Sequence, residues 1–146
     1  MAILDAERQS SIDSLREEAN EYWDKNRKKY FSIIIEAWNL YPEPKINWNE
    51  SYSMAREMFE AYLIEKNINE AKKWLDFMIA HENNLHLNEY EIDHNIGKFF
   101  YEKGDLEKAY ESWDKIVRIK MVGYRYFEDE DPKYIKFYKE QRKIKK

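Results

Sequence analysis

The sequence has 146 residues, enough for one domain with a substantial core, and it has no cysteine, which excludes disulfides and thiolate metal sites. Only 3 glycines and 3 prolines are available for turns, which favours long helices over a sheet of many strands. The net charge is −4, but residues 133–146 carry seven Lys/Arg against one Glu, so the first 132 residues sum to −10. An acidic body favours a basic partner and argues against binding of nucleic acid.

Neither a membrane span nor a secretory leader is expected. No apolar run approaches the roughly 18 residues that a spanning helix needs. The N-terminal stretch "MAILDAERQSS" lacks the basic flank and apolar centre of a signal peptide. We therefore predict a cytoplasmic protein that does not bind membranes.

Apolar residues recur at helical spacing from the N-terminus onward. Ile12 and Ala19 lie on one stripe of a first helix, for which Ser11 is a candidate N-cap. A second helix is predicted over about 27–40. The stretch "YPEP" (41–44) ends it, because proline lacks a backbone donor and disfavours helical geometry in the preceding residue.

The same periodicity predicts four further helices before residue 121. The stretches "YPEP" (41–44) and "NNLHLN" (83–88) separate three helical pairs, and Gly104 forms the turn within the third pair. The predicted helices span about 50–66, 69–82, 89–103 and 106–120.

The last helix is predicted to begin after an acidic run. Asp131 suits an N-cap and Pro132 the first helical position. Tyr134, Phe137 and Tyr138 then fall on one stripe, as in a helix that caps an array. The interleaved lysines and aromatics of this tail would also suit RNA or an anionic membrane, but the single apolar stripe favours capping.

One stretch carries a specific repeat pattern. "NIGKFFYEKGDLEKAYESWDKI" (95–116) resembles a tetratricopeptide repeat nearly position for position, with Gly97 and Ala109 as small packing residues, Gly104 at the turn and Trp113 on the second helix. Small residues let two antiparallel helices approach closely, and large ones fill the space to the next pair. Residues 52–79 match more loosely, and the first pair keeps only the ending "EAWNLYP".

Two other stretches extend this resemblance. "EAWNLYPEPKINWNESY" (36–52) and "GYRYFEDEDPKYIKFYKE" (123–140) look like signature stretches of small bacterial tetratricopeptide-like proteins. Members of that family are often encoded beside secreted polymorphic toxins and are regarded as their immunity proteins. The resemblance implies a protein that binds and neutralises one cognate toxin. A general adaptor or peptide-binding module in a regulatory or secretion pathway is the alternative.

The predicted fold is accordingly all-α, with antiparallel hairpins stacked as a short, right-handed tetratricopeptide-like solenoid. It forms a single domain over 1–146. Its parts are hairpins at about 11–42, 50–82 and 89–120 and a capping helix at about 131–144.

No catalytic motif is present. The sequence has no Ser in a G-x-S-x-G elbow and no glycine-rich phosphate loop. His81, His86 and His94 are spaced five and eight apart across a predicted loop, unlike helical zinc ligands, and are expected to face solvent or a partner. We predict no enzyme, no metal, no cofactor and no small-molecule substrate.

A repeat scaffold binds through its concave face, lined mainly by the first helix of each pair. Removing the core stripe leaves a set of residues expected to be uncovered there: Arg56, Glu60, Glu91, His94, Asn95, Lys98, Tyr101 and Glu102. The acidic run Glu128, Asp129, Glu130 and Asp131 precedes a predicted helix, and carboxylates at a helix N-terminus interact favourably with the helix dipole. The same run would equally suit an exposed acidic surface that attracts a basic toxin. Against a nuclease toxin, carboxylates would mimic phosphates and speed encounter by electrostatic steering.

Overall fold

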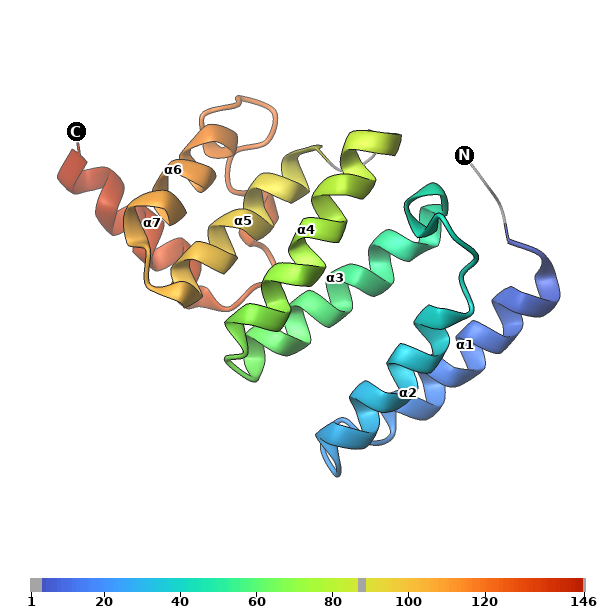
Figure 1. Ribbon diagram of the computed structural model, residues 1–146. Helices are drawn as coiled ribbons and strands as arrows, with labels where there is room; N and C mark the ends of the chain where they lie inside the picture. The colour runs from blue at the N-terminus through green and yellow to red at the C-terminus, as the bar shows by residue number, and fades with distance from the viewer. Residues whose placement is uncertain (1–3, 87–88, 146) are drawn as a thin grey trace. The chain divides into compact units, whose positions relative to one another are not determined.

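Helices make up the fold, as predicted (Figure 1). The computed structural model describes residues 4–86 and 89–145, and no β-strand element forms in that part of the chain. It divides into two compact units, Met1–Met54 and Ala55–Lys146. The elements are α1 (Ala6–Asn20), α2 (Arg27–Asn39), η1 (Lys45–Asn47), α3 (Asn49–Ile64), α4 (Ile68–Leu85), α5 (Glu89–Lys103), α6 (Leu106–Val117), η2 (Arg125–Phe127) and α7 (Pro132–Lys145).

In the first unit, α1 starts earlier than the sequence indicated. The side chain of Asp5 accepts a hydrogen bond from the backbone N–H of Arg8 and caps the helix. Ser11, expected to be the N-cap, lies inside the helix and its Oγ donates to the carbonyl of Glu7 at 3.2 Å. That prediction is wrong because the first turn of α1 is polar, so apolar periodicity does not reveal it.

Helices α1 and α2 pack against each other in this unit. Ile12 and Ala19 of α1 and Ile34 and Ala37 of α2 are completely buried. Asn26 caps α2 by accepting from the backbone N–H of Lys29, which fixes the start of the helix immediately after the turn.

The second unit begins within α3, and a short turn leads into α4. The Asn67 side chain accepts from the backbone N–H of Glu70 and caps α4. This helix continues to Leu85, beyond its predicted end at about residue 82. It stops where His86 adopts a left-handed backbone conformation (φ 54°) and donates its N–H to the carbonyl of Glu82.

Helices α5 and α6 pack against each other and approach closely at Gly97. A Cβ atom placed on Gly97 would lie 2.6 Å from Cε2 of Trp113, so any other residue there would force the indole or the backbone to shift. Ala109 on α6 is fully buried. Gly104 forms the turn at φ +96°, and Asp105 caps α6 by accepting from the backbone N–H of Lys108.

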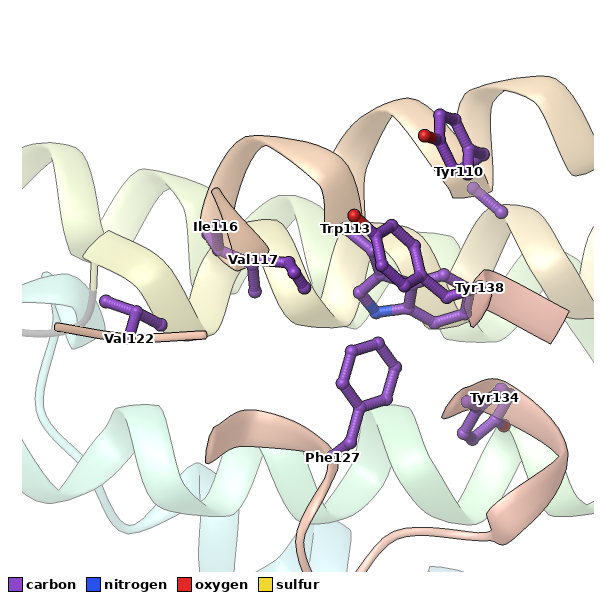
Figure 2. Close-up of a cluster of buried hydrophobic side chains, with 9 residues drawn as sticks. Tyr110, Trp113, Ile116, Val117, Val122, Phe127, Tyr134 and Tyr138 are labelled. Atoms are coloured by element: carbon purple, nitrogen blue, oxygen red, sulfur yellow. The ribbon is translucent and has the colours of Figure 1, made fainter. Parts of the chain in front are cut away.

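An aromatic cluster joins α6 to the C-terminal segment (Figure 2). Trp113, fully buried, has its ring centroid 5.4 Å from that of Phe127 and 5.6 Å from that of Tyr134. Tyr110 stacks on Tyr138 at 5.2 Å with an interplanar angle of 14°. The segment between α6 and α7 therefore contributes Val122 and Phe127 to the core of this unit, although about half of its residues are exposed.

Helix α7 begins as predicted. Pro132 is its first residue, and Oδ1 of Asp131 accepts from the backbone N–H of Lys133 at 3.0 Å. Tyr134 and Tyr138, two members of the predicted stripe, are buried against the rest of the unit.

Candidate functional site

The polar face of α5 is more enclosed than expected. His94, Asn95 and Lys98 are only 2%, 1% and 4% exposed, so the expectation that the core leaves them uncovered is wrong. The reason is a second layer: Phe127 of η2 lies edge-on to His94, with ring centroids 5.3 Å apart, and Glu130 contacts both His94 and Lys98.

His94 links the aromatic core to the acidic run. The indole Nε1–H of Trp113 donates to Nδ1 of His94 at 3.1 Å, and Nε2 of His94 lies 3.1 Å from Oε1 of Glu130. An indole can only donate, so Nδ1 must accept, and neutral His94 carries its proton on Nε2 and donates it to Glu130. Both ring nitrogens are thus engaged, and neither is presented to a substrate as a base in this arrangement.

Lys98 is the buried cation of the site. Its Nζ lies 3.1 Å from Oε1 of Glu130 and 3.4 Å from Oε1 of Glu60. A charge withdrawn from water needs such compensation, since an unpaired buried ammonium is strongly disfavoured. Burial raises the pKa of Glu130, but the hydrogen bond from His94 and the charge of Lys98 outweigh it and hold that pKa below its ordinary value of 4.5.

This lowered pKa predicts an acid-dependent loss of stability. Since the folded pKa of Glu130 is depressed, its contribution is fully present above pH 4.5 and is lost as the pH falls through the folded pKa. We expect Glu130→Gln to lower the free energy of unfolding by about 2 kcal/mol near neutral pH, with the difference from wild type shrinking in acid.

Urea denaturation at a series of pH values measures this difference. Glu128→Gln, at an exposed neighbouring position, is the matched control and should follow the wild type. A Glu130→Gln deficit that stays constant from neutral to acid pH would show that the carboxylate charge is not what stabilises the contact.

Three other residues of the predicted binding face, Arg56, Glu91 and Glu102, also form ion pairs or hydrogen bonds within the chain. Arg56 on α3 forms an ion pair with Glu91 on α5. Oε1 of Glu102 accepts from the hydroxyl of Tyr134 at 2.8 Å and from Nζ of Lys133 at 2.7 Å. Burial and this hydrogen bond raise the pKa of Tyr134, and the same carboxylate raises the pKa of Lys133.

Helix α7 also covers Tyr101. Its ring meets those of Tyr134 and Phe137 edge-on, each at a centroid distance of 5.3 Å. Tyr101 is therefore half-buried, and the expectation that Tyr101 and Glu102 are left uncovered does not hold.

Two hollows share Glu60 and Glu130 in their walls. The first, which we call the Ile64 hollow, has a volume of about 410 Å³ and lies beside Ile64, Lys66 and Tyr134. The second, the Arg56 hollow, has a volume of about 500 Å³ and is lined by Arg56, Glu60, Glu91, His94, Asn95, Arg125, Tyr126, Glu128, Asp129 and Glu130. Its lining contains five carboxylates against two guanidinium groups, so it is net negative.

The acidic run divides between three positions. Glu130 points inward to His94 and Lys98, whereas Glu128 and Asp129 are exposed at the Arg56 hollow. Asp131 caps α7 and lines the Ile64 hollow. The two uses considered for this run, a helix cap and an exposed acidic surface, thus correspond to different residues of it.

Sequence reasoning missed two residues of the Arg56 hollow, Arg125 and Tyr126. The only available signal was the alternation of aromatic and polar residues in "GYRYF" (123–127), which indicates a segment with one face packed. The guanidinium carbon of Arg125 lies 5.3 Å from the ring centroid of Tyr126.

The histidines differ from expectation in burial. His81 and His94 are buried, and only His86 is exposed. Across residues 4–86 and 89–145, no group of three or more His, Asp or Glu side chains is placed to hold a metal ion. Within the same residues no helix is both long and apolar enough to cross a membrane.

Comparison with protein-family models, with curated proteins and with solved structures finds no match to this chain. The candidate site is therefore defined by the chain's own residues: the Arg56 hollow, floored by α5 and bounded by α3 and by the segment 125–130.

Proposed function

We propose that this chain is a protein-binding helical-repeat scaffold whose partner presents a basic surface to the Arg56 hollow. The observation that carries the proposal is the net negative lining of the hollow, in which Glu128 and Asp129 stand exposed. A positively charged surface gains both affinity and association rate from such a site.

A short tetratricopeptide-like solenoid, right-handed and capped by α7, is the architecture we propose for the scaffold. The contact of Gly97 with Trp113 and the fully buried Ala109 support it, because repeats of this kind need small residues where two helices cross. In such an array the first helix of each pair lines the binding face, which agrees with α3 and α5 flanking the Arg56 hollow.

The role we propose for the scaffold is that of a cytoplasmic immunity protein, which neutralises a cognate toxin by occupying its basic active-site surface. The resemblance of residues 36–52 and 123–140 to bacterial immunity proteins supports this role. Carboxylates at the hollow would take the place of the phosphates that a nuclease toxin binds.

The test is capture followed by rescue. The chain is used to capture partners from its source organism, and each captured protein is then expressed in cells with or without this chain. Rescue from a toxic partner is expected, with an affinity that falls as salt rises. Recovery of several non-toxic clients, with no rescue, would overturn the immunity role and favour a general adaptor.

A second measurement tests whether the negative charges of Glu128 and Asp129 contribute to binding of the partner. Glu128→Lys/Asp129→Lys should weaken binding of the captured partner, since both residues are exposed and their replacement leaves the core intact. Binding that is insensitive both to salt and to this charge reversal would overturn the proposal that the partner presents a basic surface.

A further inference from the structure

We propose that His94 is a proton sensor built into the α5–α6 pair, and that its protonation breaks the hydrogen bond from Trp113. The evidence is the pair of groups that the buried ring contacts: an obligate donor at Nδ1 and a carboxylate at Nε2. Imidazole is the side chain whose charge ordinarily changes between about pH 5 and about pH 8.

The contact at Nδ1 exists only while His94 is neutral. The indole Nε1–H of Trp113 lies 3.1 Å from Nδ1 and can only donate, so Nδ1 must hold a lone pair. A protonated ring has an N–H group at both positions, and two N–H groups would then face each other. Trp113 has no exposed surface and its ring packs against Gly97, so breaking the bond leaves a buried N–H without its acceptor.

The other side of the ring attracts a proton. Oε1 of Glu130 lies 3.1 Å from Nε2 of His94. The pKa of Glu130 lies below its ordinary value despite burial, because His94 and Lys98 stabilise the carboxylate, so Glu130 stays charged in mild acid. An imidazolium would turn the hydrogen bond at Nε2 into a stronger, charge-assisted one. Proton uptake therefore strengthens the bond to Glu130 and removes the bond from Trp113.

The charged and titratable groups around His94 come from several elements. Those that line the Arg56 hollow with it are the carboxylates Glu60, Glu91, Glu128, Asp129 and Glu130, the cations Arg56 and Arg125, and the phenol of Tyr126. Lys98 reaches Glu130 from the next turn of α5, and α4, which also packs against α5, carries the buried His81 and Glu82. Around the hollow, five carboxylates against three cations leave a net negative charge, which attracts a proton.

Protonation of His94 also adds one positive charge to the wall of the Arg56 hollow. This consequence rests on the proposed function, because it concerns the affinity for a partner with a basic surface. Such a partner would meet a less negative site, so its affinity should fall roughly twofold to fivefold between neutral pH and mild acid. The scaffold would then release its partner more readily where the pH is low.

Nitrogen-15 NMR of the full chain, recorded from about pH 8 to about pH 5, tests the contact directly. At the upper end we expect the His94 tautomer with its proton on Nε2. On acidification Nδ1 should take up a proton, and the indole N–H resonance of Trp113 should shift with the same midpoint. Trp48 is the internal reference, because its Nε1–H donates at 2.7 Å to the carbonyl of Pro42, which does not titrate.

Two variants and a control assign the response to this contact. His94→Gln cannot take up the proton and should abolish the shift of Trp113. Glu130→Gln keeps an acceptor for Nε2 but removes the attracting charge, so the midpoint should fall by about one pH unit. His86→Asn should respond as wild type does, because His86 is exposed and Asn tolerates its left-handed backbone (φ 54°).

A Trp113 resonance that stays constant while the His94 ring takes up a proton would overturn the proposal. So would a ring that takes up no proton over this range, or a response that Trp48 shares or that His86→Asn removes. Equal partner binding at both ends of the pH range would overturn the link to binding. Failure of rescue would instead overturn the immunity role alone, because the NMR measurement uses the free chain.

Discussion

Replacing Trp113 with alanine is expected to lower the free energy of unfolding by about 3–5 kcal/mol, the range for truncating a large buried aromatic side chain. Trp113 has no exposed surface, and its ring contacts Phe127 and Tyr134. Its indole N–H is also the donor to Nδ1 of His94. The substitution therefore opens a cavity and leaves a buried acceptor unsatisfied.

Urea denaturation followed by far-ultraviolet circular dichroism measures this loss. Trp113→Phe separates its two causes, because phenylalanine retains most of the ring but cannot donate to His94. Met121→Ala is the control: Met121 is 89% exposed, and its truncation should change stability by less than about 0.5 kcal/mol. A loss below about 1 kcal/mol for Trp113→Ala would contradict the central position of Trp113 in the core.

Gly97→Ala is expected to destabilise the fold by about 2 kcal/mol, although alanine is the better helix former. The added methyl group would lie 2.6 Å from the indole of Trp113, which is fully buried and has little room to move. Overpacking of a well-filled core costs roughly 1–3 kcal/mol. The cost should lie near the top of this range, because three ring atoms of Trp113 would lie within 2.8 Å of the added carbon. It is only partly offset by the gain in helix propensity, which is about 1 kcal/mol at an exposed site.

A double substitution identifies the cause. If the clash with the indole is responsible, Gly97→Ala should cost less in a Trp113→Phe background, where the smaller ring leaves space. Gly104→Ala serves as a comparison, since residue 104 has open space around it but a φ of +96°, and its strain should be unaffected by Trp113→Phe. Additive effects of Gly97→Ala and Trp113→Phe would rule out the clash.

The helices could be predicted from the sequence because apolar periodicity is a local property. The spacing of Ile12 and Ala19 or of Tyr134 and Tyr138 indicates one buried stripe, and these residues are buried. The start of α1 could not be read in this way, because Asp5 acts through a single polar hydrogen bond.

The candidate site was only partly predictable, for a different reason. Periodicity on α5 distinguishes the stripe that faces one neighbouring helix from the remainder, and it assigns the remainder to solvent. His94 and Lys98 instead face a second layer that contains Phe127 and Glu130. That layer is an irregular segment, and a contact such as Lys98–Glu130 joins positions 32 residues apart, which no local spacing encodes.

The caps at Asn26, Asn67 and Asp105 determine where the chain can accept an inserted residue. Each accepts from the backbone N–H three residues on and so fixes the residue at which α2, α4 or α6 begins. A helix advances about 100° per residue, so a cap displaced by one position would rotate the whole face of the helix that follows. For α6, such a rotation would move Trp113 off Gly97. Insertions are therefore tolerable before these caps, but not between a cap and the first buried residue of its helix.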